Sequence, residues 1–204
     1  RPDGYFGNCD PNNKKNYRTR CSALISFDKN NTLIDTSPDL RGQLLSQKVS
    51  SINEVLYTHC HADQTHGIND LRVFYLKQQK KIKVYCDEVT SKYLTKNFSY
   101  CFIKKYDYPP ILTLKSLKKE FTLGNAGKKI NINAIKVRHG LIDSVAYIIN
   151  KKIAYVSDAN EFYKKDFFKF KKLNYLIIDC LRYNKHPSHF NLENVFKINK
   201  SLGP

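Results

Sequence analysis

Three of the six histidines in this 204-residue chain lie within eight positions of one another, beside an aspartate and before a glycine. The stretch reads Tyr57-Thr58-His59-Cys60-His61-Ala62-Asp63-Gln64-Thr65-His66-Gly67. In an extended segment, residues two apart point the same way, so His59 and His61 can face one ion while Cys60 turns away. Imidazole and carboxylate groups at this spacing suit zinc or a similar divalent ion. The cluster therefore indicates a metal site, with Asp63 as a further candidate ligand.

Two more candidate ligands, His139 and Asp158, stand at the ends of segments that we expect to be strands. Side chains at distant strand ends converge when the strands are neighbours in one sheet, and α/β folds place their chemistry at such ends. A His-x-His pair alone is weak evidence for a metal. The pattern His-x-His-x-Asp after a buried strand, with strand-terminal His139 and Asp158 following in order, is much stronger.

The elements that must position these residues are short apolar and helical segments separated by turn residues. We expect strands at residues 21–27, 32–36, 52–58, 82–85, 130–137, 144–149, 152–156 and 175–178. We expect helices at residues 38–45, from 68 to about 74, 88–98, 162–170 and from about 192. Residues 1–20 are polar and rich in turn residues, which predicts a loop. This order indicates an α/β fold in one domain.

Length and composition limit what the chain can be. Its 204 residues and 41% hydrophobic content fit one globular domain with a substantial core. The longest apolar runs, such as Tyr175–Ile178, fall far short of the ~20 residues that span a bilayer. The N-terminus shows no charged start, apolar stretch and small-residue cleavage site, and the six cysteines are widely spaced. We therefore expect a cytoplasmic protein with free thiols and no membrane partner.

The formal net charge of +17 favours anionic partners, because a field of this sign raises the local concentration of phosphates and nucleic acids. The lysines are scattered along the whole chain, however, and an amino-acid bias acting on solvated faces would give the same pattern. Both interpretations stay open, so the charge alone does not name the ligand.

The stretch from His59 to Gly67 resembles the H-x-H-x-D-H motif of the metallo-β-lactamase superfamily of hydrolases. His139 with Gly140 is similar to the next histidine motif of that family, and Tyr155-Val156-Ser157-Asp158 is similar to its bridging-aspartate motif. Three further segments resemble the branch that contains phosphoribosyl 1,2-cyclic phosphate phosphodiesterase and is related to ribonuclease Z: Arg1 to Cys9, Arg18 to Ser22 and Gly67 to Arg72. The likeness covers nearly the whole chain, in order.

The resemblance implies a four-layer αββα sandwich of two mixed β-sheets, the metallo-β-lactamase fold, with a metal centre at one sheet edge. We expect residues 1–204 to form a single domain of this kind. Relative to the family, we expect the N-terminal strand and the C-terminal strand with the last histidine ligand to lie outside these residues.

Carried over residue by residue, the resemblance assigns His59, His61 and His139 to a first ion. Asp158 would bridge to a second ion that is held partly by Asp63, which makes both aspartates catalytic candidates as well. The cofactor would be zinc or manganese, as one or two ions. A water or hydroxide on the ions would be the nucleophile, since a bound divalent cation lowers the pKa of water to about 7.

Gln64 departs from the motif, because the family usually has a histidine ligand of the second ion at this position. The neutral amide of glutamine is a poor metal ligand. The number of ions, and with it the choice between a working hydrolase and a non-catalytic relative, depends mainly on this position.

Four other residues are candidates for contact with substrate. His189 precedes an expected helix, where backbone N–H groups and the helix dipole favour anions. The resemblance implies that His189 protonates the leaving oxygen and that His186 contacts the substrate, although both fit a surface or helix-capping role as well. Arg18 and Arg20 can grip a phosphate, but exposed arginines before a strand are commonplace.

Four residues are candidates for supporting roles. Asp179 ends an expected strand and can hydrogen-bond a metal-bound histidine, which would fix its tautomer. A plain strand-end carboxylate fits equally well there, and Asp35 and Asp70 are weaker candidates of the same kind. We expect His66 to shape the turn at Gly67 rather than bind the metal.

We therefore expect a metal-dependent phosphodiesterase that acts on a small cyclic or nucleotide-like phosphoester. One alternative is a ribonuclease Z-like transfer-RNA 3′-end endonuclease, which the basic charge would suit but for which no Gly/Pro-rich arm is clear. Another is a non-catalytic member that binds a metal or a nucleotide. The aromatic segment from Tyr100 to Pro110 would be a lid or a homodimer contact, or else a packed surface loop.

Overall fold

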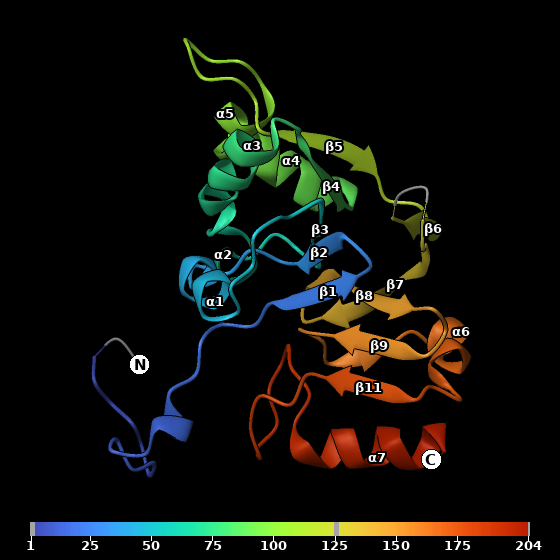
Figure 1. Ribbon diagram of the computed structural model, residues 1–204. Coiled ribbons are helices and arrows are strands. Elements are labelled where there is room, and N and C mark those ends of the chain that lie inside the picture. Colours follow the sequence, from blue (N-terminus) through green and yellow to red (C-terminus); the bar gives the residue numbers. More distant parts are fainter. Residues whose placement is uncertain (1–2, 125–126, 204) are drawn as a thin grey trace.

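The computed structural model of the protein describes residues 3–124 and 127–203. Two mixed β-sheets pack face to face, and helices cover the outer side of each sheet (Figure 1). This arrangement confirms the expected α/β sandwich. The N-terminal segment, which holds the short 3-10 helix η1 (Lys14–Asn16), reaches away from the body of the molecule (Figure 1).

The first sheet contains the strand that leads into the histidine cluster. Its order is β1-β2-β3-β4-β5, with β1 antiparallel to β2 and all other neighbours parallel. The strands are β1 (Ala23–Phe27), β2 (Asn30–Ile34), β3 (Glu54–Leu56), β4 (Ile82–Cys86) and β5 (Leu112–Ser116). The helical elements of this half are α1 (Leu40–Ser46), α2 (Ala62–Thr65), η2 (Ile68–Leu71), α3 (Arg72–Gln78), α4 (Glu88–Asn97) and α5 (Ser99–Phe102).

The second sheet has the order β10-β7-β8-β9-β11, and β6 pairs with β7. Among the described residues of this second sheet, β9 and β11 are the only parallel neighbours, and the other neighbouring strands are antiparallel. The strands are β6 (Glu120–Leu123), β7 (Ile130–His139), β8 (Ile142–Ile149), β9 (Ile153–Val156), β10 (Glu161–Phe162) and β11 (Tyr175–Ile178). Its helical elements are α6 (Lys164–Phe167), η3 (Phe168–Phe170) and α7 (Leu192–Leu202).

Strand β8 contributes side chains to the hydrophobic clusters on both faces of the second sheet. Val145, Tyr147 and Ile149 face the first sheet and pack between the two sheets. Ala146 and Ile148 lie in the cluster that the second sheet forms with η3 and α7. Because successive side chains of a strand point to opposite faces, a strand that is buried on both faces reads as a nearly unbroken apolar run.

All eight expected strands are present within about two residues of their expected bounds, and β8 and β9 form the expected hairpin across Asn150 and Lys151. The expected helix over residues 162–170 is wrong in part. Phe162 belongs to β10, which pairs with β7, and only α6 and η3 are helical. Its ring lies 4.6 Å from that of Phe170 between centroids, so tertiary packing overrides the local helical pattern.

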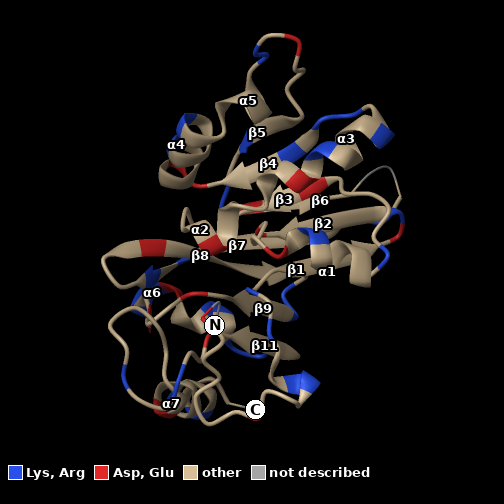
Figure 2. Cartoon of the chain, turned by 90° about the vertical axis from the view of Figure 1, so that its left-hand side faces the viewer, with Lys and Arg blue, Asp and Glu red and all other residues tan. Residues whose placement is uncertain are grey.

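Lys and Arg residues are spread over elements in both halves of the molecule (Figure 2). All six cysteines carry free thiols. Within the described residues, no helix combines the length and the apolar character needed to cross a membrane.

Candidate metal centre

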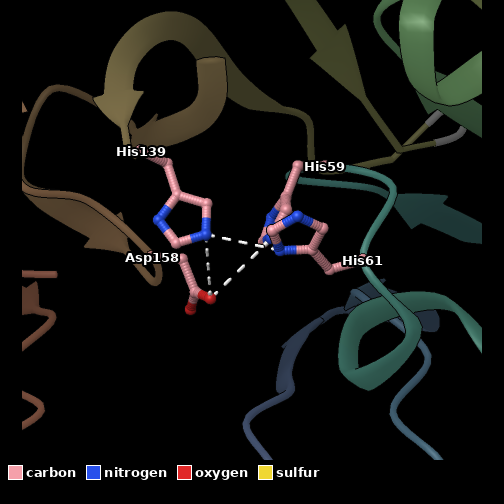
Figure 3. Close-up of side chains that lie close together, drawn as sticks. All are labelled: His59, His61, His139 and Asp158. Carbon is pink, nitrogen blue, oxygen red and sulfur yellow. Dashed lines mark hydrogen bonds and ion pairs between the residues drawn. The ribbon is translucent and has the colours of Figure 1, made fainter. Parts of the chain in front are cut away.

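Four side chains converge at the edge of the sandwich where strands of both sheets end: His59, His61, His139 and Asp158. One nitrogen or oxygen atom of each lies within 4.8 Å of those of the other three. His59 and His61 follow β3 in the first sheet, whereas His139 ends β7 and Asp158 follows β9 in the second (Figure 3). Each sheet therefore contributes two of the four candidate ligands.

Two hydrogen bonds between the sheets bring these strand ends together. The backbone N–H of Val145 donates to the carbonyl of Thr58 over 2.9 Å. The hydroxyl of Tyr147 donates to the carbonyl of Tyr57 over 2.7 Å. Since β8 carries both donors and pairs with β7 up to His139, the last residue of β7 is held beside the segment that follows β3.

A close backbone approach fixes the turn after His61. A Cβ atom on Gly67 would lie 2.0 Å from the carbonyl oxygen of Ser37, so this position accepts only glycine without movement. The N–H of Gly67 donates to Thr36 and the N–H of Thr36 donates to the carbonyl of Gln64, both over 2.8 Å. These contacts clamp α2 against the loop that follows β2.

Gly140 has the corresponding role in the tight turn between β7 and β8. Its φ of +62° is a left-handed conformation that glycine adopts without strain. Its N–H donates to the side chain of Asn160 over 2.7 Å, and a Cβ atom there would lie 2.9 Å from the Cβ of Ser188. The turn therefore allows the segment around Ser188 to lie directly against His139.

Hydrogen bonds fix the tautomers of two cluster histidines. The Nδ1 of His139 donates to the carbonyl oxygen of Ser188 over 2.6 Å, because a carbonyl can only accept. The hydroxyl of Thr58 donates to the carboxylate of Asp35 over 2.8 Å, and therefore accepts from the Nδ1 of His59 over 3.0 Å. In both rings the other nitrogen, Nε2, is left with a bare lone pair.

The candidate ligand atoms of the four residues lie close together. The Nε2 atoms of His59 and His139 lie 3.0 Å and 3.3 Å from the Nδ1 of His61. The Oδ2 of Asp158 lies 3.7 Å from the Nε2 of His59 and 3.8 Å from that of His139. Three imidazole nitrogens and one carboxylate oxygen are a ligand set that suits zinc and similar divalent ions. The residues present therefore fit one such ion.

Burial tunes the protonation of this cluster. It lowers the pKa of His59 to about 3, with repulsion from His61 and His139 adding to the effect. Burial also lowers the pKa of His139 and raises that of Asp158 to about 6. The neutral imidazole is the form that binds a metal, so the protein holds these rings ready for an ion at neutral pH.

Asp179 and His189 form a pair next to the cluster. The carboxylate of Asp179 accepts from the Nδ1 of His189 over 2.7 Å and from the N–H of Ala159 over 3.1 Å. The ring of His189 packs edge-on against His139, with centroids 4.8 Å apart. Asp179 was a candidate to bond a metal-binding histidine or to be a plain strand-end carboxylate; it bonds the Nδ1 of His189, which leaves the Nε2 of that ring beside the cluster.

The other residues that the sequence suggested for the site lie outside the group of four convergent residues. The ring of His186 lies 5.0 Å from that of His189. Arg18 is exposed, and the guanidinium of Arg20 is engaged by Asp39 at 3.1 and 3.2 Å. His66 bonds the hydroxyl of Tyr93 over 2.9 Å.

Asp63 lies beside the cluster but outside the group of four whose donor atoms converge. Three contributors to the site escaped sequence analysis: the carbonyl of Ser188, the hydroxyl of Thr58 and the thiol of Cys21, which contacts Gln64. The first acts through its backbone, for which a sequence carries no signal.

A groove of about 1080 Å³ lies between the ends of β4 and β5, the middle of β7 and α6. Its lining includes Asp87, Lys119 and Lys136 but none of the four convergent residues. The groove is therefore a separate feature from the candidate centre.

Comparisons with known proteins identify the family and several relatives of this chain. Residues 30–204 match the family model described as "Beta-lactamase superfamily domain". An octanoyltransferase of Porphyromonas gingivalis (strain ATCC BAA-308 / W83) is 31% identical over 189 residues, which are 91% of this chain. The chain spans only 37% of the length of that curated relative.

Solved structures share the same architecture. A diphosphatase from the PhnP family is 26% identical, with a TM-score of 0.83 over 96% of this chain and 75% of that chain. The short form of human tRNase Z is 13% identical, with a TM-score of 0.68 over 91% of this chain and 82% of that chain. The Zn²⁺-bound PqqB of Methylobacterium extorquens is 14% identical, with a TM-score of 0.67 over 92% and 66%. The last two likenesses concern the fold alone.

Proposed function

Because this chain belongs to the beta-lactamase superfamily domain family, we propose that it is a metal-dependent hydrolase that cleaves a phosphodiester in a small cyclic or nucleotide-like phosphate. The observation that carries the proposal is the convergence of three imidazole nitrogens and one carboxylate oxygen beside the pair of His189 and Asp179. The similarity to a diphosphatase from the PhnP family supports a phosphoester or phosphoanhydride as the bond that is cleaved.

His59, His61, His139 and Asp158 would hold the divalent ion, zinc or manganese. Such an ion, when bound, lowers the pKa of a water and polarises a phosphoryl oxygen. The bonds from Thr58 to His59 and from Ser188 to His139 would keep these two rings in the orientation that binding requires.

His189 is the group proposed to move a proton to the leaving oxygen. Asp179 holds its Nδ1–H, so the ring has a fixed orientation and its Nε2 can give or take a proton at the cluster. The positive net charge of the chain would raise the local concentration of an anionic substrate.

The test is an assay of the full-length protein loaded with manganese or zinc. The substrates are bis(p-nitrophenyl) phosphate as a model phosphodiester and phosphoribosyl 1,2-cyclic phosphate. We expect metal-dependent turnover that a His59→Ala variant lacks. Turnover no higher than that of the variant, with either metal, would rule the proposal out.

The same preparations separate the alternatives. Cleavage of a precursor transfer RNA at its 3′ end, without turnover of the small phosphodiesters, would favour the nuclease. Tight metal binding without any hydrolysis would favour a non-catalytic member. The chain spans only 37% of the Porphyromonas gingivalis octanoyltransferase, so the activity of that protein does not carry over to this chain.

A further inference from the structure

The side chain of Gln64 is fully buried next to the four convergent residues, with 0% of its surface exposed. Its Nε2 donates to the Sγ of Cys21 over 3.2 Å and to the Oδ2 of Asp63 over 3.4 Å. The thiol of Cys21 in turn lies 3.5 Å from the Oε1 of Gln64. One amide therefore joins a thiol from before β1 to the carboxylate at the start of α2.

The orientation of this amide follows from its neighbour. A carboxylate only accepts hydrogen bonds, so the NH₂ end of Gln64 must face Asp63. The backbone on both sides is held as well, since the carbonyl of Gln64 accepts from Thr36 and the carbonyl of Thr65 accepts from the Thr36 hydroxyl. The amide is thus fixed in place with its hydrogens toward Asp63.

This arrangement does not suit a second cation. A ligand must direct a lone pair at the ion, whereas Gln64 directs N–H hydrogens at the very carboxylate that would share the ion. Asp63 also lies outside the group of four donors that converge within 4.8 Å. The residues that fit the first ion are complete without it.

We propose that the centre of this chain holds one divalent ion, on His59, His61, His139 and Asp158. The amide of Gln64, held by Cys21, takes the place of a second ion and keeps Asp63 beside the centre as a hydrogen-bond acceptor rather than a ligand. The proposal rests on the metal centre of the proposed function but not on catalysis.

The experiment measures metal content and ligand type rather than activity. The full-length protein is stripped with a chelator, loaded with excess Zn²⁺ or Co²⁺, desalted and analysed by mass spectrometry for bound metal. Gln64→His supplies an imidazole at the position in question. Gln47→His, at an exposed position after α1, is the matched control.

We expect one equivalent of metal in the unaltered protein and in Gln47→His, and two in Gln64→His. The Co²⁺ spectrum of the unaltered protein should show no thiolate-to-cobalt band, and Cys21→Ala should leave that spectrum unchanged. Two equivalents or none in the unaltered protein, or a thiolate band, would overturn the proposal. A folded Gln64→His that still takes one equivalent would overturn the role given to Gln64.

If Gln64→His fails to fold, as judged by circular dichroism, the metal content and spectrum of the unaltered protein still decide the matter. Hydrolysis does not enter this readout. One ion without turnover would remove the proposed function and leave this inference standing, whereas two ions with turnover would do the reverse.

Discussion

At the scale of single residues, the site depends on groups that orient the candidate ligands rather than on the ligands alone. Asp35 is buried and accepts from both the N–H and the hydroxyl of Thr58, each over 2.8 Å. Thr58 in turn accepts from His59. This chain of hydrogen bonds, from His59 to Thr58 to Asp35, determines which nitrogen of His59 carries the proton and which faces the cluster.

Replacing Asp35 with Asn should therefore weaken metal binding. The asparagine can offer an N–H to Thr58, which would then point its own hydrogen at His59 and favour the wrong tautomer. We expect the affinity for Zn²⁺ to fall by about 10–100-fold, as is usual when a group that orients a metal ligand is lost. Competition with a chromogenic chelator measures it, and Asp107→Asn in an exposed loop is the control. Unchanged affinity in Asp35→Asn would contradict the role given to this chain of hydrogen bonds.

His189 gives a second prediction at this scale. If it moves a proton and does not hold the ion, His189→Asn should lower kcat by about 10²–10⁴-fold while the bound metal stays the same. The matched control is His66→Asn, because His66 bonds Tyr93 instead of a cluster residue and should leave kcat unchanged. Loss of metal together with activity in His189→Asn would show that the residue is a ligand or a structural support.

The sequence reveals the candidate ligands more readily than the groups that support them. His59, His61, His139 and Asp158 could be found because their types and their places at strand ends form a pattern. Ser188 could not, because it contributes a carbonyl that every residue has. The contact between Cys21 and Gln64 joins residues 43 positions apart and exists only in the folded chain.

At the scale of elements, the sequence was informative where apolar runs were long. β7 and β8, with ten and eight residues, were expected nearly in full. β10 has two residues and α2 has four, which is too short for any period to show. β5 follows two prolines and β6 is half exposed, so neither offered a clear apolar pattern.

The turn at Gly67 allows a prediction about these short elements. Gly67→Ala would place a Cβ 2.0 Å from the Ser37 carbonyl, so α2 or the loop after β2 must shift. We expect the free energy of unfolding to fall by about 1–3 kcal/mol, the usual cost of overpacking. Gly42→Ala in α1 meets nothing within 4 Å and should be neutral or stabilising. Equal unfolding midpoints in urea for the two variants would contradict this account.

At the scale of the whole molecule, the resemblance found in the motifs is confirmed by the family match and by the two mixed sheets. Lys and Arg residues lie on many elements in both halves of the molecule (Figure 2), so their placement along the chain does not by itself favour the nuclease. The contacts between the two sheets matter more for the candidate site, because each sheet supplies two of the four candidate ligands.

The Tyr147→Phe variant tests these contacts between the two sheets. The change removes a buried hydroxyl that bonds the Tyr57 carbonyl across the sheets over 2.7 Å. We expect the free energy of unfolding to fall by about 1–2 kcal/mol, since a buried acceptor loses its donor. Tyr183→Phe, at a site that is 82% exposed, should change it by less than about 0.5 kcal/mol. Urea denaturation followed by fluorescence compares the two, and similar values would mean that water replaces the lost bond.

The equal division of ligands between the sheets has a thermodynamic consequence. An ion bound there is a cross-link between the two halves of the sandwich, so unfolding or parting of that edge must release it. By mass action, free Zn²⁺ at 100 times its dissociation constant should add about 2.7 kcal/mol to the stability of the fold. A chelator should lower the melting temperature accordingly, and amide exchange near Thr58 and Val145 should speed up first. The supply of the metal would then affect how stable the folded protein is.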